Sequence, residues 1–498
     1  MIIKVPRRAL GRVAIGLMFA FVLNGDERND TRLLDFTVVA VDSQGQPVND
    51  LSPGEFQVTD AGKRQPINFF RHNDSKPLQA PALGSNEFSN RGRAKDPHVT
   101  LVLFDLLNER FATRGVAGNQ IIHDLERLEA ADSLYLYLLN VDGRMYPVRG
   151  VSNREEEAQP LDDGPWTRRI KPMLDDALRA VLRMRPVDID VAARVQLTLN
   201  ALSAIAAQLS IFPGRKNIVW VTDGVPIALG ERRSDVGEAV DFTPQMRQLS
   251  ESFDRSETAI YPVQQIMIGS PDAMGGTGLG SKAFLDELAG LTGGRPNSGK
   301  DIGAAVRQAV NDARTSYQIG YYATLRNWDS KFHKLRITCT RKGVRIQARS
   351  GYYAWPEPTG ARAERAIEAA VSTASDAAEI GLQGSLTPDP KNPLTLHAAL
   401  RIDANDVALA QDGDQYQGQL RIAIVGYQPT GRVTNSTIVP LDIHYSARER
   451  DNALREGIAL AQDLTLDKNV NRLRFIVFDR GSNTIGSLTI PVSAGVRP

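Results

Sequence analysis

Hydrophobic positions in the middle of the chain follow two alternating patterns. Nearly continuous apolar runs, such as residues 99–104 and 217–221, are typical of strands that are covered on both faces of a parallel sheet. Between such runs, apolar residues recur every three or four positions, which predicts helices at residues 121–128, 174–184, 195–209, 246–253, 282–291 and 302–310. Strands that alternate with helices predict a doubly wound α/β unit over residues 96–315, with helices on both faces of its sheet.

Shorter strands, separated by turn residues, flank this unit on both sides. They are expected at residues 36–41, 56–60, 66–70, 317–322, 332–340, 344–348 and 351–353. Neither group is large enough to bury a core by itself. Pairing the two groups therefore predicts one small β domain, residues 31–75 together with 316–355, into which the α/β unit is inserted. Residues 74–97 are rich in Pro, Ser, Asn and Gly, and we interpret them as a linker.

The last part of the chain is predicted to be all-β. Residues 357–384 are rich in Ala and Glu and are expected to form a helical connector. Six strands then recur at a spacing typical of sandwiches, at residues 394–402, 419–427, 436–444, 457–466, 472–478 and 485–492. We therefore expect an independent antiparallel β-sandwich over residues 385–498, and a multidomain fold of α/β plus all-β class.

The N-terminal segment, residues 1–25, has the pattern of an export signal or anchor. Four basic residues precede an apolar run at residues 13–23. The run is short for a transmembrane helix, and no clear small-x-small cleavage site follows it. A cleaved signal, an uncleaved anchor and a buried N-terminal helix all stay open. The expected location is periplasmic, secreted or envelope-anchored, with membrane contact only through a possible N-terminal anchor.

Composition narrows the classes of partner. The formal net charge is +1 and aromatic residues make up 6% of the chain, so neither charge nor stacking residues point to nucleic acid. Cys339 is the only cysteine, which excludes an intrachain disulfide. Its neighbours alternate apolar and polar, and we interpret it as a buried strand residue rather than a reactive thiol.

Two aspartates indicate a candidate ligand-binding site. Asp105 and Asp223 each follow an apolar strand, and ligands of parallel α/β sheets bind at the carboxyl ends of the strands. No zinc-hydrolase or serine-hydrolase motif is present in the sequence, so no catalytic residue is assigned. The glycine-rich residues 275–282 resemble a phosphate-binding loop, but their Ser and Lys are inverted. We interpret this segment as a surface loop and expect no organic cofactor.

Several motifs together resemble a von Willebrand factor A domain. The sequence VLFD at residues 102–105 matches the first strand, and PGRKN at 213–217 with WVTDG at 220–224 matches a later one. More narrowly, residues 35–353 resemble the VWFA-related acidobacterial domain family of exported bacterial proteins. The additional matches are residues 48–58, 65–70, 104–108, 317–321, 332–333 and 348–353. The family implies an exported binding or scaffold protein and no established reaction.

The resemblance also implies a site for a divalent cation. Such domains bind Mg²⁺ or Ca²⁺ through Asp-x-Ser-x-Ser, a Thr on a second loop and an Asp on a third. Asp105, Thr198 and Asp223 take these three places, and Asn108 could supply an oxygen. Both serines are replaced, by Leu107 and Glu109, so the site is degenerate.

Two interpretations of these residues stay open. They either form a weak metal site, or they cap loops and the starts of neighbouring helices. We predict weak or absent Mg²⁺ binding, because a ligand is missing. The carboxylates of Asp105 and Asp223 should approach each other, stabilised by backbone N–H groups and by Thr198 or Lys216.

The sequence favours a non-enzymatic adhesion or assembly module that binds a protein partner in the cell envelope. Two alternatives remain at this point. One is a structural scaffold whose A-type domain has lost its site, and the other is a hydrolase whose catalytic residues are scattered along the sequence.

Overall fold

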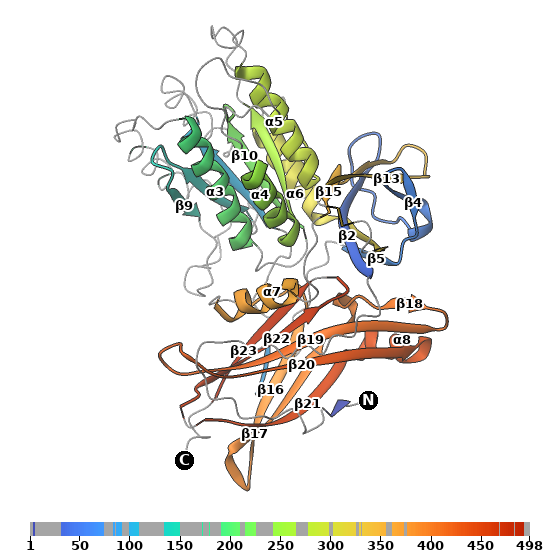
Figure 1. Cartoon of the computed structure of the whole chain (residues 1–498), viewed down its shortest axis with the longest axis vertical. Helices are drawn as coiled ribbons and strands as arrows, with labels where there is room; N and C mark the ends of the chain where they lie inside the picture. The colour runs from blue at the N-terminus through green and yellow to red at the C-terminus, as the bar shows by residue number, and fades with distance from the viewer. Residues whose placement is uncertain are drawn as a thin grey trace.

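The computed structural model describes most of the chain in three units (Figure 1). The described residues are 3–4, 31–73, 83–84, 86–91, 99–108, 134–149, 172, 179, 191–209, 215–225, 243–264, 277–297, 302–324, 328–329, 331–354, 361–372, 376–467, 469–482 and 484–492. The parallel-sheet unit comprises those between 99 and 315, and the flanking β unit those of 31–73 and 316–354. The C-terminal unit comprises residues 3–4, 86–91 and those of 361–492.

Some sequence predictions fall outside these residues. They are most of the segment 1–25, the helices expected near residues 121–128 and 174–184, Glu109, and residues 213–214 of the PGRKN motif. From the N-terminal segment, the structure describes only a two-residue strand, β1 (Ile3–Lys4). No helix in the described part of the chain combines the length and the apolar character that a membrane span requires.

The parallel-sheet unit contains a five-stranded sheet in the order β11-β10-β7-β8-β9. The strands are β7 (Val99–Asp105), β8 (Leu134–Leu139), β9 (Met145–Arg149), β10 (Lys216–Thr222) and β11 (Thr258–Gln264). Four of them are parallel, and β9 returns antiparallel to β8 after a turn in which Gly143 has φ +77°. The expected mostly parallel sheet is therefore confirmed.

Helices cover both faces of this sheet, as the apolar periodicity predicted. Helix α6 (Ile302–Arg314) packs on one face. On the other face lie α3 (Val191–Leu209), α4 (Thr243–Arg255) and α5 (Thr277–Thr292). The interpretation of residues 275–282 as a surface loop is wrong from Thr277 onward, because α5 begins there. The run of glycines concealed this helix start from the sequence pattern.

The chain reverses its direction of travel across the sheet between β7 and β10. From β7 it continues to β8 on one side, and later it returns to β10 on the other side of β7. Folds of this class bind ligands at such a switch point, beyond the carboxyl ends of the two strands. Asp105 ends β7 and Thr222 ends β10, so both residues lie at the switch point.

The flanking β unit is built from two distant parts of the chain. One sheet has the order β14 (Arg345–Gln347), β2 (Thr31–Val41), β12 (Ser316–Thr324), β5 (Phe69–Asn73). The other has the order β15 (Gly351–Tyr353), β13 (Phe332–Cys339), β3 (Phe56–Asp60), β4 (Lys63–Gln65).

Strand β12 pairs with both β2 and β5, and β13 pairs with β3. The predicted pairing of the two flanking segments is therefore confirmed, and the two segments share one apolar core. Cys339 is only half-buried and has a free thiol, which corrects the expectation of a buried position.

The C-terminal unit consists of two mainly antiparallel sheets that enclose a common core. The first sheet has the order β1, β21 (Ile458–Thr465), β17 (Asn392–Ile402), β16 (Leu382–Asp389), β6 (Glu87–Ser89). The second has the order β18 (Ala410–Asp412), β19 (Gln415–Tyr427), β22 (Arg472–Asp479), β23 (Ile485–Pro491), and β20 (Val433–Ser446) also pairs with β19.

All six strands predicted in this region are present. Helix α7 (Ala361–Ser372), within the expected connector, packs on the second sheet. Figure 1 shows α7 between the C-terminal sheets and the parallel-sheet unit. Strand β16 begins at Leu382, inside the segment expected to be the connector, and helix α8 (Ala447–Glu456) was not predicted.

The linker interpretation of residues 74–97 is wrong at its centre. Strand β6 pairs antiparallel with β16, and the next residue, Asn90, is buried against the same sheet. The Asn90 amide nitrogen donates to the carbonyl oxygens of Ala377 and Ile380, at 2.8 Å each, and its oxygen accepts from Leu382 N at 2.8 Å. A strand of three residues is too short to show a period, so the sequence pattern could not reveal it.

Replacing Asn90 by Ala is expected to lower the stability of the C-terminal unit by about 2 to 3 kcal/mol, because it leaves Leu382 N and two carbonyls without partners. Hydrogen exchange of the Leu382 amide should accelerate correspondingly. The control is Glu87→Ala, in which an exposed side chain of the same strand is removed. Equal exchange rates in the two variants would contradict this role of Asn90.

Candidate functional site

Asp105 lies buried at the switch point and is held by four hydrogen bonds. Its Oδ1 accepts from Asn108 N at 3.0 Å. Its Oδ2 accepts from Asn108 Nδ2 at 2.7 Å, from Thr222 Oγ1 at 2.9 Å and from Trp220 Nε1 at 3.1 Å. Only 1% of the residue is exposed. Most of the acceptor positions of the carboxylate are therefore occupied by hydrogen-bond donors of the protein itself.

The local sequence explains this geometry. After β7 the chain turns, so that Leu106 packs into the core on one face of the sheet and Leu107 into the core on the other. Because these adjacent leucines pack into opposite faces of the sheet, the chain turns and brings Asn108 back over Asp105. Leu107 is 4% exposed, and an apolar side chain at this position offers no oxygen ligand.

Thr198 joins the same cluster from the middle of α3. Its Oγ1 accepts from Asn108 Nδ2 at 2.8 Å and donates to the carbonyl oxygen of Arg194 at 2.9 Å. The structure thus brings together three of the four residues that the sequence nominated: Asp105, Asn108 and Thr198.

The fourth, Asp223, is half-buried just beyond β10, and it is not a hydrogen-bond partner of Asp105. Its backbone carbonyl accepts from Gln264 Nε2 at 3.1 Å.

Two partners of Asp105 were missed by the sequence interpretation. Trp220 and Thr222 lie on β10, next to β7, and both have side chains that donate to the aspartate. Donor side chains on the strand next to a buried acid are a pattern from which these two hydrogen bonds could have been predicted. The expected donation from a backbone N–H group is confirmed by Asn108 N.

The expectation for Lys216 is wrong. Lys216 pairs in register with Val99, at the beginning of the strands, whereas Asp105 lies at their end. Its Nζ lies 3.9 Å from Glu379 Oε1 in the C-terminal unit. Lys216 begins β10 and Asp105 ends the neighbouring parallel strand β7, so the two residues lie at opposite ends of the sheet.

The electrostatic environment of Asp105 is that of a carboxyl group that is shielded from water. Burial raises the pKa of Asp105, and the hydrogen bonds from Asn108, Thr222 and Trp220 oppose that rise. The burial effect is the larger one. An acid that loses its hydration in this way depends on its protein donors, so removal of the carboxylate or of its donors should be costly.

The residues at this site fit a divalent cation poorly. Mg²⁺ demands octahedral coordination by oxygen, and Ca²⁺ takes six to eight oxygen ligands. Here Asp105 Oδ2 already accepts three hydrogen bonds, Leu107 offers no oxygen, and Asn108 directs its amide nitrogen at the carboxylate. Within the described residues, Asn108 Oδ1 is a buried acceptor without a hydrogen-bond partner, and no cluster of three acidic, His or Cys side chains could hold a metal.

A small cavity lies elsewhere, where the three units meet. It lies toward the end of the parallel-sheet unit where Lys216 and Glu257 stand, away from the switch point. Its lining residues are Asp35, Thr37, Arg215, Phe253, Asp254, Glu257, Thr258, Leu291, Thr292, Arg349, Glu379, Ser482 and Thr484. Sequence patterns gave no indication of this cavity, because its walls come from segments that are far apart in the chain.

Comparisons with known proteins add little to this description. No family model matches the chain, and no curated protein matches it. One similar solved structure is described as a β-glucosidase involved in saponin metabolism from intestinal bacteria, at 10% sequence identity and a TM-score of 0.16. The match covers 79% of this chain, and the chain spans 50% of the length of that one. A similarity at this TM-score carries no argument about fold or function.

Proposed function

We propose that the chain is an exported, non-enzymatic protein that binds a protein partner in adhesion or assembly at the cell envelope. In this proposal it belongs to the VWFA-related family. The parallel-sheet unit is a von Willebrand A-type domain inserted in the flanking β unit, and the C-terminal unit is a β-sandwich. The partner docks at the carboxyl ends of the parallel strands, without a metal ion.

One observation carries this proposal. At the switch point, where such folds bind ligands, protein donors surround Asp105 in the place that a cation takes in related domains. A domain with this arrangement keeps the shape of the binding edge without depending on metal. The basic and apolar N-terminal segment supports the exported location.

A titration of the full chain with Mg²⁺ is expected to show no stoichiometric heat, and the melting temperature should be the same in EDTA and in excess Mg²⁺. The physical reason is that a cation must displace three donors from Asp105 Oδ2. Isothermal calorimetry measures the first quantity and scanning calorimetry the second. Tight binding of one equivalent, lost in Asp105→Ala, would overturn the metal-independent part of the proposal.

Partner binding is tested by cross-linked capture from an envelope extract, with the full chain as bait. A saturable partner should be recovered equally with EDTA and with Mg²⁺, and its recovery should fall with Asp223→Ala, at the binding edge. Glu368→Ala, on the exposed side of α7, is the matched control. Recovery that depends on Mg²⁺ would restore a metal-dependent site, and failure to recover any saturable partner would favour a structural scaffold.

A further inference from the structure

The parallel-sheet unit and the flanking β unit are joined by buried, uncharged groups as well as by an ion pair. Gln347 of β14 is 7% exposed, and its Nε2 donates to Tyr261 Oη at 3.1 Å and to the carbonyl oxygen of Gly293 at 2.9 Å. Arg349 pairs with Asp254 across the same junction. Only one residue separates α6 from β12 along the chain. These two units therefore form a single body, which we call the two-unit body.

Charged side chains connect the C-terminal unit to the two-unit body. Lys216 Nζ lies 3.9 Å from Glu379 Oε1. Arg71 Nη1 lies 3.5 Å from Asp406 Oδ1 and 3.5 Å from the carbonyl oxygen of Asn405. Among the described residues, no apolar cluster contains side chains from both bodies. Domains that meet without a shared apolar core are expected to move relative to each other.

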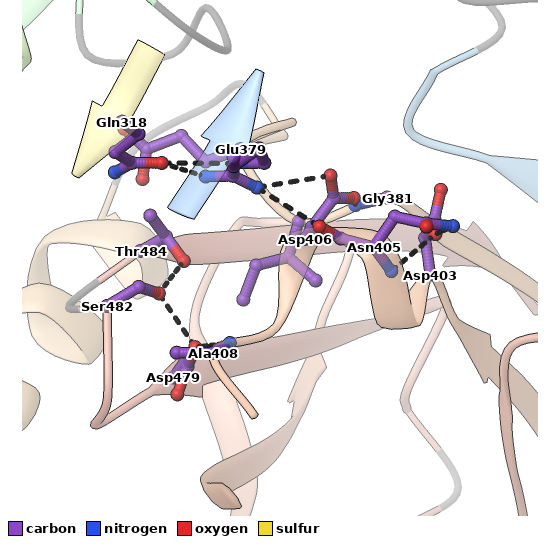
Figure 2. Close-up of polar contacts among 12 residues, drawn as sticks. Gln318, Glu379, Gly381, Asp403, Asn405, Asp406, Ala408, Asp479, Ser482 and Thr484 are labelled. Carbon is purple, nitrogen blue, oxygen red and sulfur yellow. Dashed lines mark hydrogen bonds and ion pairs between the residues drawn. The ribbon is translucent and has the colours of Figure 1, made fainter. Parts of the chain in front are cut away.

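The two acids of this junction are held in place by the C-terminal unit itself. Glu379 Oε2 accepts from Ile485 N at 2.9 Å. Asp406 Oδ2 accepts from Gly381 N at 2.8 Å, two residues beyond Glu379 (Figure 2). Neither acid therefore needs the two-unit body to fix its position.

The two basic groups are likewise held by the two-unit body. Gln318 Oε1 accepts from Arg71 Nε at 3.0 Å, and Gln318 Nε2 donates to Glu257 Oε1 at 2.8 Å. Lys216 begins β10, and its backbone N donates to the carbonyl oxygen of Glu257 at 3.1 Å. Docking therefore brings together charges that each body has already positioned.

Burial makes each of these charges dependent on the opposite one. The side chain of Lys216 is fully buried and that of Glu379 is 9% exposed. Burial lowers the pKa of Lys216 and raises the pKa of Glu379 to about 7, and each of the two groups opposes the shift of the other. A buried charge that loses its partner destabilises the docked form, whereas separation of the bodies returns it to water.

We propose that the C-terminal unit docks reversibly on the two-unit body, and that the pairs Lys216–Glu379 and Arg71–Asp406 form a charge clasp that holds it there. The proposal goes beyond the partner-binding function, since it concerns a conformational change of the chain itself. Glu379 lines the small cavity between the units, so opening of the clasp exposes the walls of this cavity. In the open form, water and salt ions reach all four charges.

The test compares two single variants with their combination in the full chain at pH 8, where Glu379 is ionised. Glu379→Gln keeps an acceptor for Ile485 N and removes the negative charge opposite Lys216. Lys216→Met removes the positive charge and leaves the carboxylate. Each single variant is expected to lower the docking constant by at least about 100-fold, because it leaves one member of a buried pair. The double variant leaves neither charge, and its docking constant should return to within about 10-fold of the original.

Docking is measured by the rate at which a thiol reagent labels Thr484→Cys. Thr484 is 5% exposed and lines the cavity between the units. Cys339→Ala is present in every chain, so that the introduced thiol is the only one. When opening and closing are fast, the labelling rate is proportional to the open fraction, and it should rise by about 100-fold in each single variant. The control is Glu456→Gln, an exposed acid of α8, which should leave the rate unchanged.

Salt tests the charge clasp without any substitution. Ions screen the four charges in the open form and do not reach them in the docked form. The radius of gyration of the unmodified chain, measured by X-ray scattering, should therefore increase between about 0.05 M and about 0.5 M NaCl.

The proposal is overturned if the unmodified chain keeps the same radius at both salt concentrations, and this measurement decides alone if the variants do not fold. It is also overturned if the folded single variants are labelled at the original rate. A double variant that is labelled as fast as the single ones would overturn it as well, because the two charges would then act independently. None of these readouts involves a partner, so failure of the charge clasp is distinguishable from failure of the proposed binding function.

Discussion

Replacing Asp105 by Ala is expected to lower the free energy of unfolding of the parallel-sheet unit by about 3 to 5 kcal/mol. The change removes the acceptor for Asn108 N, Asn108 Nδ2, Trp220 Nε1 and Thr222 Oγ1 at a site without access to water. Each buried donor that loses its partner costs about 1 to 3 kcal/mol. Partial rearrangement of Thr222 and Asn108 keeps the total below the sum of four such losses.

Urea unfolding in EDTA and in excess Mg²⁺ measures this loss and separates its two possible causes. The loss should be the same in both buffers, since the donors, not a cation, stabilise the carboxylate. Asp223→Ala is the matched control, an aspartate at the end of the neighbouring strand that is half-buried, and it should cost under about 1 kcal/mol. A loss that appears only in Mg²⁺ would show that Asp105 is a metal ligand.

Replacing Gly294 by Ala is expected to destabilise the parallel-sheet unit by at least about 4 kcal/mol, or to prevent its folding. A Cβ atom at this position would lie 1.8 Å from the carbonyl oxygen of Ile260 and 2.7 Å from its carbon. Neither backbone can retreat easily. Ile260 lies within β11, and Arg215 holds the carbonyl oxygen of the preceding residue, Gly293, at 2.7 Å.

The matched control is Gly54→Ala, where a Cβ meets nothing within 4 Å. Its stability should change by less than about 1 kcal/mol. Soluble yield and thermal unfolding of the two variants decide the comparison. Gly294→Ala with the stability of the control would mean that the end of α5 does not approach β11 as closely as the structure has it.

Gly294, Asp105 and Glu379 act at three different levels of the structure. Gly294 permits the helix α5 to close on the sheet, Asp105 completes the carboxyl edge of that sheet, and Glu379 connects the finished unit to its neighbour. A variant at the first level removes the whole unit, whereas one at the third should leave each unit intact and change only the docking.

The sequence by itself determined the elements whose signal is local. Continuous apolar runs identified β7 and β10, helical periodicity identified α3, α4 and α6, and six C-terminal strands were located from alternation and turns. The cluster of Asp105, Asn108 and Thr198 was also foreseeable, because residues at the carboxyl ends of adjacent parallel strands and their following turns must share one edge.

Only the tertiary structure decided which distant groups meet. Asn90 bonds to Ala377 across 287 residues, Lys216 points to Glu379 instead of Asp105, and Trp220 donates to the buried acid from a neighbouring strand. The physical reason is that periodicity reports how a segment hides its own apolar face, whereas these contacts arise from the need to satisfy polar groups that several segments bury together. That need depends on the packing of the whole chain, and no local pattern records it.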